Sequence, residues 1–309
     1  MLPPKLMASH PATLAVLGVE GKLASGVAVH LGDRQTVTTD GTGRASFAVP
    51  ATGSYLVATA SGASVAALVD PAVGLSEPQA VTLPPVVSVR DRFWICGAGL
   101  SGEADANIVK INGETALVLA ASLECIVVLP GTKAAPGPAS ISVEAPGVKW
   151  SATTTIVSLE FEAPNPLLKP GQKGRLGIRV RGSSDKMRIV VRNETPGVLR
   201  FLGSDTLEVV SGGGPENLAG ISVQAVTSGN FSFRAHLVPA PDAAGAGRYL
   251  LAAATLAPKD VRRELLDIAR RLKRHPRDTR WMQVRLQRIA TRTMAGDFRT
   301  LVDSARADL

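Results

Sequence analysis

Short β-prone segments separated by turn residues fill most of this chain and limit what it can fold into. From about residue 11 to residue 257, runs of Val, Ile, Leu and Thr alternate about every 8–12 residues with Gly, Pro, Asn or Asp. This rhythm is typical of antiparallel β-sandwiches, whose short strands reverse direction at each turn. The chain has 309 residues, of which 45% are hydrophobic, so several domains with separate cores can form.

Changes in composition along the chain predict six segments. Asp40-Gly41 is a strong hairpin turn inside the first β unit, and a Pro-bearing stretch at 76–85 separates that unit from the second. A Pro/Ala/Gly run at 239–247 indicates a linker after the third unit. We expect an N-terminal tail at 1–10, immunoglobulin-like β-sandwiches at 11–84, 85–157 and 158–241, a linker at 242–257, and a basic amphipathic helical hairpin at 258–309.

The second unit contains several motifs in a characteristic order. FWICGAGL at 93–100 precedes NIVKING at 107–113, ALV at 116–118 and IVVLP at 126–130. On these motifs, residues 86–157 resemble the IPT/TIG immunoglobulin-like domain, with Leu100 where that family more often has Phe. The resemblance implies a small sandwich, often extracellular and used for adhesion or spacing, and implies no catalytic residue.

The first unit has a looser resemblance. VAVHL at 27–31 and TDGTGRASF at 39–47 are similar to stretches of bacterial Ig-like or carboxypeptidase-regulatory-like domains. The fold class we predict is therefore mainly β, with tandem immunoglobulin-like β-sandwiches and a C-terminal α-helical hairpin.

The last 52 residues have a helical pattern. Apolar residues recur at i, i+4, i+7 and i+11 up to His275-Pro276, and Asp278 then caps a second helix at 279–305. The apolar face of the second helix is a candidate docking surface, formed by Met282, Leu286, Ile289, Met294, Phe298 and Leu301. A separate basic stripe is a candidate for binding an anionic surface, formed by Arg285, Arg288, Arg292 and Arg299. An isolated amphipathic hairpin leaves its apolar face exposed, so we expect it to pack within the chain, on another copy or on a partner protein.

The basic character of the protein is confined to this tail. The formal net charge is +8, but residues 258–309 alone contain fourteen Lys and Arg against seven Asp and Glu. The remainder is nearly neutral, and aromatic residues make up only 4% of the chain. This composition disfavours nucleic acid as a partner, although lipid headgroups, wall polymers and nucleic acid all remain among the anionic surfaces that the tail could contact. No stretch is long and apolar enough for a transmembrane helix, so any membrane contact would be peripheral.

Two cysteines, Cys96 and Cys125, lie 29 residues apart in the second unit. They are either two buried thiols or one disulfide, and we predict the disulfide. A disulfide and extracellular-type domains favour a location outside the cytoplasm. The N-terminal sequence has no apolar signal-peptide core, so export implies either a mature chain renumbered after cleavage or a start codon placed too far downstream. A cytoplasmic protein remains the alternative. The high Ala, Gly and Arg content suggests a bacterial source.

The motifs that could indicate chemistry have simpler explanations. GAGLSG at 97–102 matches G-x-G-x-x-G but is followed by a strand rather than the helix a dinucleotide requires. Glu103, Asp105 and Asn107 alternate like calcium ligands but are too few for a site. Glu160 and Glu162 share a strand face that we expect to be solvated. We predict no cofactor, no metal site and no catalytic residues.

The function expected from these features is structural. We predict a non-enzymatic structural, adhesive or protein-binding protein of the bacterial cell envelope or exterior. One alternative is a subunit of a larger envelope or membrane-associated complex that docks through its C-terminal helices. A second alternative is an enzyme, or an accessory part of one, with a site between domains.

Overall fold

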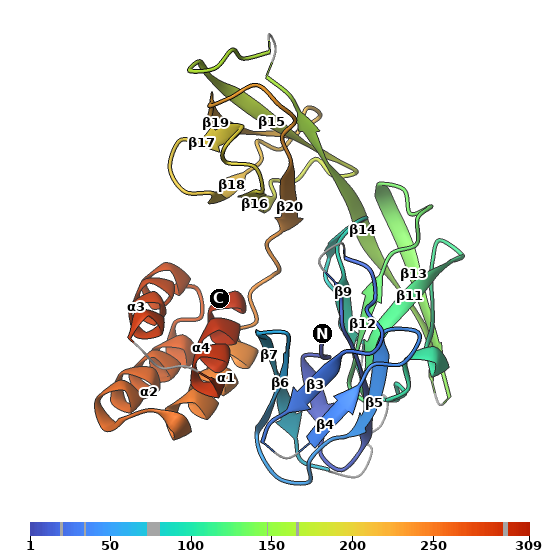
Figure 1. The fold of residues 1–309 in the computed structure, drawn as a ribbon. Coiled ribbons are helices and arrows are strands. Elements are labelled where there is room, and N and C mark those ends of the chain that lie inside the picture. Colours follow the sequence, from blue (N-terminus) through green and yellow to red (C-terminus); the bar gives the residue numbers. More distant parts are fainter. Residues whose placement is uncertain (19–20, 34, 73–80, 147, 165–166, 293–295) are drawn as a thin grey trace.

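A computed structural model shows three β-sandwiches in series, followed by a helical module that returns to the first sandwich (Figure 1). The structure describes residues 1–18, 21–33, 35–72, 81–146, 148–164, 167–292 and 296–309. The predicted fold class is confirmed: the chain is mainly β, with immunoglobulin-like sandwiches followed by α-helices. No helix in the described ranges is both long enough and apolar enough to span a bilayer.

The first sandwich contains strands β1 to β7. Their bounds are β1 (Lys5–Met7), β2 (Pro11–Ala15), β3 (Ala28–Leu31), β4 (Gln35–Thr38), β5 (Arg44–Ala48), β6 (Tyr55–Ala60) and β7 (Ala63–Asp70). One sheet has the order β1-β7-β6-β3-β4, and β2 pairs with β5 opposite it. Residues 1–10 were expected to be a tail, which is wrong, because β1 pairs with β7 in parallel and Leu6 is fully buried in the core.

The second sandwich contains seven strands and one short 3-10 helix. These elements are β8 (Val86–Ser88), β9 (Phe93–Cys96), η1 (Ala104–Ala106), β10 (Ile108–Ile111), β11 (Glu114–Ala121), β12 (Cys125–Leu129), β13 (Gly137–Ala145) and β14 (Val148–Glu162). A turn at Asn112-Gly113 joins β10 to β11, with both residues at positive φ. Alternate residues of these strands fill a core that includes Ile95, Val109 and Ile141.

Strand β14 belongs to two sandwiches. Its first part pairs with β13, and its second part pairs with β15 of the third sandwich. Neighbouring side chains on a strand point to opposite faces, so Ile156 is buried in the second core and Val157 in the third. The third sandwich continues with β15 (Lys173–Arg181), β16 (Arg188–Asn193), β17 (Leu199–Phe201), β18 (Thr206–Val210), β19 (Leu218–Ala225) and β20 (Phe233–Leu237). The boundary expected between residues 157 and 158 therefore lies inside a continuous strand.

The C-terminal region contains four helices, where the sequence predicted a linker and a two-helix hairpin. They are α1 (Ala243–Leu256), α2 (Lys259–Arg274), α3 (Thr279–Thr291) and α4 (Asp297–Ala307). The linker expected at 242–257 is wrong because its alanines favour helix and Asp242 caps α1 by accepting from the backbone N–H groups of Ala244 and Gly245. The helix expected at 279–305 is interrupted, and α4 starts after Gly296, which has a φ of 77°.

The helical module packs on the first sandwich. Its core is formed almost entirely by its own four helices, to which β7 adds Leu68 and the partly buried Ala66, and β6 adds Tyr55. The Tyr249 hydroxyl of α1 donates a hydrogen bond of 3.2 Å to the Ala66 carbonyl. The chain therefore passes from the third sandwich back to the first (Figure 1).

Candidate functional surfaces

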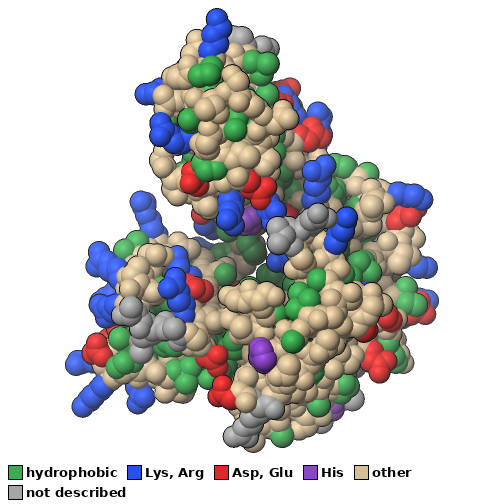
Figure 2. All heavy atoms as spheres, viewed as in Figure 1, with side chains coloured by type: hydrophobic (Ala, Val, Ile, Leu, Met, Phe, Trp, Pro, Cys, Tyr) green, Lys and Arg blue, Asp and Glu red, His purple; other side chains and the backbone are tan. Residues whose placement is uncertain are grey.

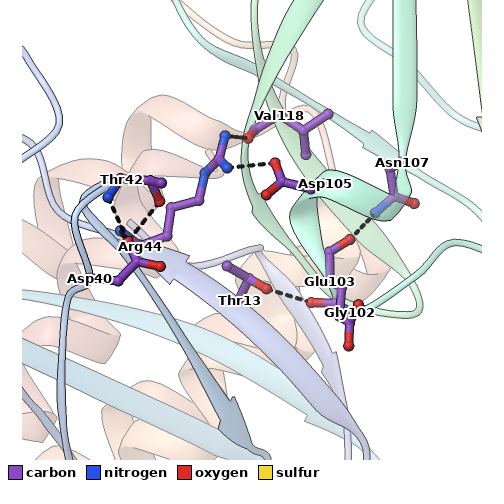
Figure 3. Close-up of polar contacts among 9 residues, drawn as sticks. All are labelled: Thr13, Asp40, Thr42, Arg44, Gly102, Glu103, Asp105, Asn107 and Val118. Atoms are coloured by element: carbon purple, nitrogen blue, oxygen red, sulfur yellow. Dashed lines mark hydrogen bonds and ion pairs between the residues drawn. The ribbon is translucent and has the colours of Figure 1, made fainter.

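The glycine-rich turn at 97–102 contacts the first sandwich (Figure 3). A Cβ built on Gly102 would lie 2.0 Å from the Pro11 carbonyl oxygen, so this position requires glycine. The Thr13 hydroxyl donates a 2.7 Å hydrogen bond to the Gly102 carbonyl. The element that follows is η1, only three residues long, and then β10. The turn therefore serves domain packing and has no helix N-terminus for a pyrophosphate.

The three oxygen-bearing side chains at 103–107 do not converge on one point (Figure 3). The Asn107 amide donates to the Ser101 and Glu103 carbonyls at 2.9 and 2.8 Å, which fixes the loop. Asp105 pairs with Arg44 of β5 at 2.6 Å, and Arg44 also donates to the Val118 carbonyl at 2.6 Å. Within the described ranges, no group of three or more His, Cys, Asp or Glu is arranged to hold a metal ion.

The paired glutamates of β14 form ion pairs across the sheet. Glu160 pairs with Arg181 at 2.6 Å, and Glu162 pairs with Arg179 at 2.5 Å. Arg179 also pairs with Glu216, which is largely exposed. These contacts give the two glutamates a structural role on the outer face of the sheet.

Three residue types common in catalytic triads meet where the second and third sandwiches join. Burial raises the pKa of Asp91, while His236, the Ser88 hydroxyl and the backbone N–H of Leu237 lower it. Ser88 and His236 therefore both act on Asp91, so the carboxylate lies between them. In a catalytic triad the histidine lies between the nucleophile and the carboxylate. Ser88 is itself buried.

Cys96 and Cys125 are directly opposite each other on β9 and β12. Their Cα atoms are 4.1 Å apart and the sulfurs are bonded, so the predicted disulfide is confirmed. The bridge joins neighbouring strands of one sheet.

The apolar face predicted to dock on a partner is buried within the chain itself. Met282, Leu286, Ile289, Phe298 and Leu301 all lie in the helical core, while Met294 lies outside the described residues. The assignment of these residues to partner docking is therefore wrong, because α1, α2 and α4 cover the face. The apolar periodicity correctly indicated that this face is buried, but it could not identify the elements that cover the face.

The predicted basic stripe is largely neutralised by acidic neighbours. Arg285 and Arg292 both pair with Glu264 of α2, at 3.0 and 3.3 Å, and Arg299 pairs with Asp303 at 3.6 Å. Of these four arginines, only Arg288 is exposed and makes no ion pair among the described residues. The predicted role of the stripe as a free anionic-binding surface is therefore wrong: Arg285 and Arg292 connect to α2, and Arg299 pairs within α4.

A different basic surface lies on the outside of α2 and α3. Its members are exposed and make no ion pair among the described residues: Lys259, Arg263, Lys273, Arg274, Arg277, Arg280 and Arg288. We call this set the outer basic surface. Figure 2 shows Lys and Arg side chains around the outer edge of the helical module, away from the sandwiches. The dense run RRLKRHPRDTR at 270–280 is the sequence signal that could have located it.

A second site missed by sequence reasoning is a group of carboxylates where the helical module and the first two sandwiches meet. Burial, the charge of Asp70 and a hydrogen bond to Asp70 raise the pKa of Glu124 to about 7. Burial and the charge of Asp242 raise the pKa of Asp308 to about 7. Lys5 opposes both shifts, so it lies close to both acids. No local sequence pattern brings these residues together.

Comparisons with known proteins give weak structural similarity. No family model and no curated protein matches the chain in sequence. The extracellular region of plexin A4 matches at 11% identity over 75% of this chain and 22% of its own length, with a TM-score of 0.29. A Bacteroides ovatus mixed-linkage glucan utilization protein, SGBP-B, matches at 12% identity over 77% of this chain and 73% of its own, with a TM-score of 0.28. The I9–I11 tandem of titin matches at 7% identity, covering 75% and 90%, with a TM-score of 0.22. The chain spans about a fifth of the plexin chain.

Proposed function

We propose that this protein is a non-enzymatic spacer located outside the cytoplasm, in which three sandwiches hold the helical module in a fixed position. The observation behind this proposal is strand β14, whose fifteen residues pass through two sandwiches without a linker. A flexible array would instead have an exposed linker with few contacts at that point. The disulfide supports a location in an oxidising compartment.

The junction between the first and second sandwiches also supports a spacer with fixed domain positions. Buried apolar residues from both sides pack together there, including Ala15, Leu119 and Val127. A backbone pairing between Thr13 of β2 and Ala121 of β11 joins the sheets of the two sandwiches. The IPT/TIG resemblance of the second sandwich agrees with a role in spacing. The alternative of a subunit docking through the apolar hairpin face has lost its basis, since that face is buried.

Distances between spin labels on the first and third sandwiches test the proposal. We expect a single narrow distance distribution in the intact chain. A flexible four-residue Gly/Ser insertion between Val157 and Ser158 should broaden it, because it divides β14 between its two pairing partners. The same insertion between Asn112 and Gly113, in an exposed turn, is the matched control and should leave the distribution narrow. A broad distribution in the intact chain would contradict the spacer proposal.

A further inference from the structure

We propose that the outer basic surface binds the headgroup layer of an anionic phospholipid membrane. The choice of a lipid over nucleic acid rests on the proposed location outside the cytoplasm; the surface itself is an independent observation.

Four acids of the helical module are already paired with arginines. Glu264, Asp267, Asp278 and Asp303 each pair with at least one arginine in the module. These pairs involve Arg270, Arg271, Arg285, Arg292, Arg299 and Arg306. On α2 and α3, Asp260 is the exposed acid for which the structure describes no ion pair. It is therefore the acid on these helices that is left to balance the seven cations of the outer basic surface. The excess positive charge of the protein is concentrated there.

The cations of α2 face away from the helical core. Val261, Leu265, Ile268 and Leu272 point into the helical core. Lys259, Arg263 and Arg274 lie at i, i+4 and i+15 on the opposite side of the same helix. Helix α2 has sixteen residues, which gives a basic face about 24 Å long. Arg277 and Arg280 extend the charge around the turn into α3.

The outer basic surface is broad and carries few free apolar side chains. Its cations are spread over the outer sides of two helices and their connecting turn, which suits a broad, diffuse layer of negative charge. The nearby Trp281 has guanidinium groups over its ring, from Arg271 at 4.3 Å and Arg285 at 5.0 Å, so it is not free to enter a bilayer. Val284 is the large apolar side chain exposed on the same face of α3. Binding would therefore be electrostatic and peripheral, with little insertion.

Vesicle sedimentation with the full-length protein tests this inference. We expect binding to vesicles of phosphatidylcholine mixed with phosphatidylglycerol, and none to phosphatidylcholine alone. Binding should decrease strongly as salt rises from about 0.05 M to about 0.5 M, because screening shortens the range of each charge. Each basic residue near a charged surface contributes about 1 kcal/mol, or about fivefold in affinity. The quadruple variant Arg263→Gln, Arg274→Gln, Arg277→Gln, Arg280→Gln should therefore bind at least a hundredfold more weakly.

A matched control separates this surface from net charge. The variant Lys110→Gln, Lys133→Gln, Lys149→Gln, Lys173→Gln removes four exposed charges from the sandwiches and should bind nearly as the parent does. Circular dichroism must show the parent fold in both variants. Equal loss in the two variants, equal binding to neutral vesicles, or no binding to anionic vesicles would overturn the inference. Tighter binding to a DNA duplex than to anionic vesicles at the same salt would also overturn it. The spin-label distances do not depend on these results, so the spacer proposal stands or fails separately.

Discussion

Arg248 of α1 forms a two-pronged ion pair with Asp70, the last residue of β7. Its Nη2 lies 2.6 Å from Oδ1 and its Nη1 lies 3.2 Å from Oδ2, and Nη2 also donates to the Val69 carbonyl at 3.4 Å. Both side chains are about one-third exposed, so the pair is partly desolvated. It joins the helical module to the first sandwich at the point where Glu124 of the second sandwich also reaches Asp70.

We expect Arg248→Met to loosen the docking of the helical module. The change retains much of the side-chain volume but leaves Asp70 and Glu124 beside each other without a guanidinium. Loss of the pair should reduce the free energy of unfolding by about 1–2 kcal/mol, which is more than an exposed pair contributes. Hydrogen exchange should increase in β7 and α1. Arg270→Met is the control, because it removes an exposed i,i+3 pair within α2 and should cost under about 0.5 kcal/mol. Equal effects of the two changes would contradict this account.

The raised pKa values of Glu124 and Asp308 predict that stability declines as pH rises. Each group has a pKa of about 7 in the folded protein, above its ordinary value of 4.5 or 3.8. The folded state therefore holds more protons than the unfolded state between those values, and the free energy of unfolding falls as pH increases through that window. Above about pH 7 the effect should level off. Thermal unfolding across this range measures it.

The double variant Glu124→Gln, Asp308→Asn should remove this pH dependence. At about pH 8 we expect the variant to be more stable than the parent by about 1–2 kcal/mol, a value reduced for the solvent exposure of Glu124. Glu114→Gln with Asp185→Asn changes two exposed carboxylates and should leave the parent's pH profile intact. An unchanged profile in the first variant would show that these acids ionise normally.

The local elements could be predicted from sequence because they depend on local patterns. The Asn112-Gly113 turn and the alternating strands depend on backbone preference and on one-sided burial. The chain also turns at Asp40-Gly41, but the hairpin predicted there is wrong, because β4 pairs with β3 in one sheet and β5 pairs with β2 in the other. The disulfide followed from the count and placement of two cysteines.

Relationships between elements could not be predicted in the same way. Whether β14 ends at residue 157 depends on pairing with β15, which lies beyond a loop, and nothing in its own sequence records that pairing. Helix α1 resembles a linker in composition because Ala and Gly occur in both. The periodicity of α3 showed that Met282 and Leu286 are buried, but their partners in α1, α2 and α4 are set by tertiary packing. Glu264 lies 21 and 28 residues from Arg285 and Arg292, so no local sequence pattern predicts that it pairs with them.

Arg44 should contribute more to the contact between the first two sandwiches than its ion pair alone suggests. Its side chain is 9% exposed, whereas its partner Asp105 is 86% exposed, so the charge pair is weakened by solvent. The hydrogen bond from Arg44 to the Val118 carbonyl is buried, so solvent does not weaken it. We expect Arg44→Met to cost about 1–3 kcal/mol, because it leaves that carbonyl unsatisfied, and Asp105→Asn to cost under about 1 kcal/mol. Chemical denaturation of the two variants measures the difference, and a larger effect for Asp105→Asn would reverse the assignment.

Residues 1–241 should fold without the helical module. Each of the three sandwich cores is formed by its own strands. The buried sandwich residue that belongs to the helical core is Leu68, which is 2% exposed in the intact chain. Removing the module exposes that side chain and its partly buried neighbours on β6 and β7, at a cost of about 1–3 kcal/mol, which is small beside three complete cores. A chain ending at Pro241 should give a β-type circular dichroism spectrum and a cooperative thermal transition. The variant Leu68→Thr in that shortened chain should restore solubility if the exposed patch causes self-association, because Thr is β-branched and therefore favours a strand, and it adds a polar group. An unfolded chain ending at Pro241 would mean that β7 requires α1 and α4 to complete the first sandwich, and that the helices form part of its core.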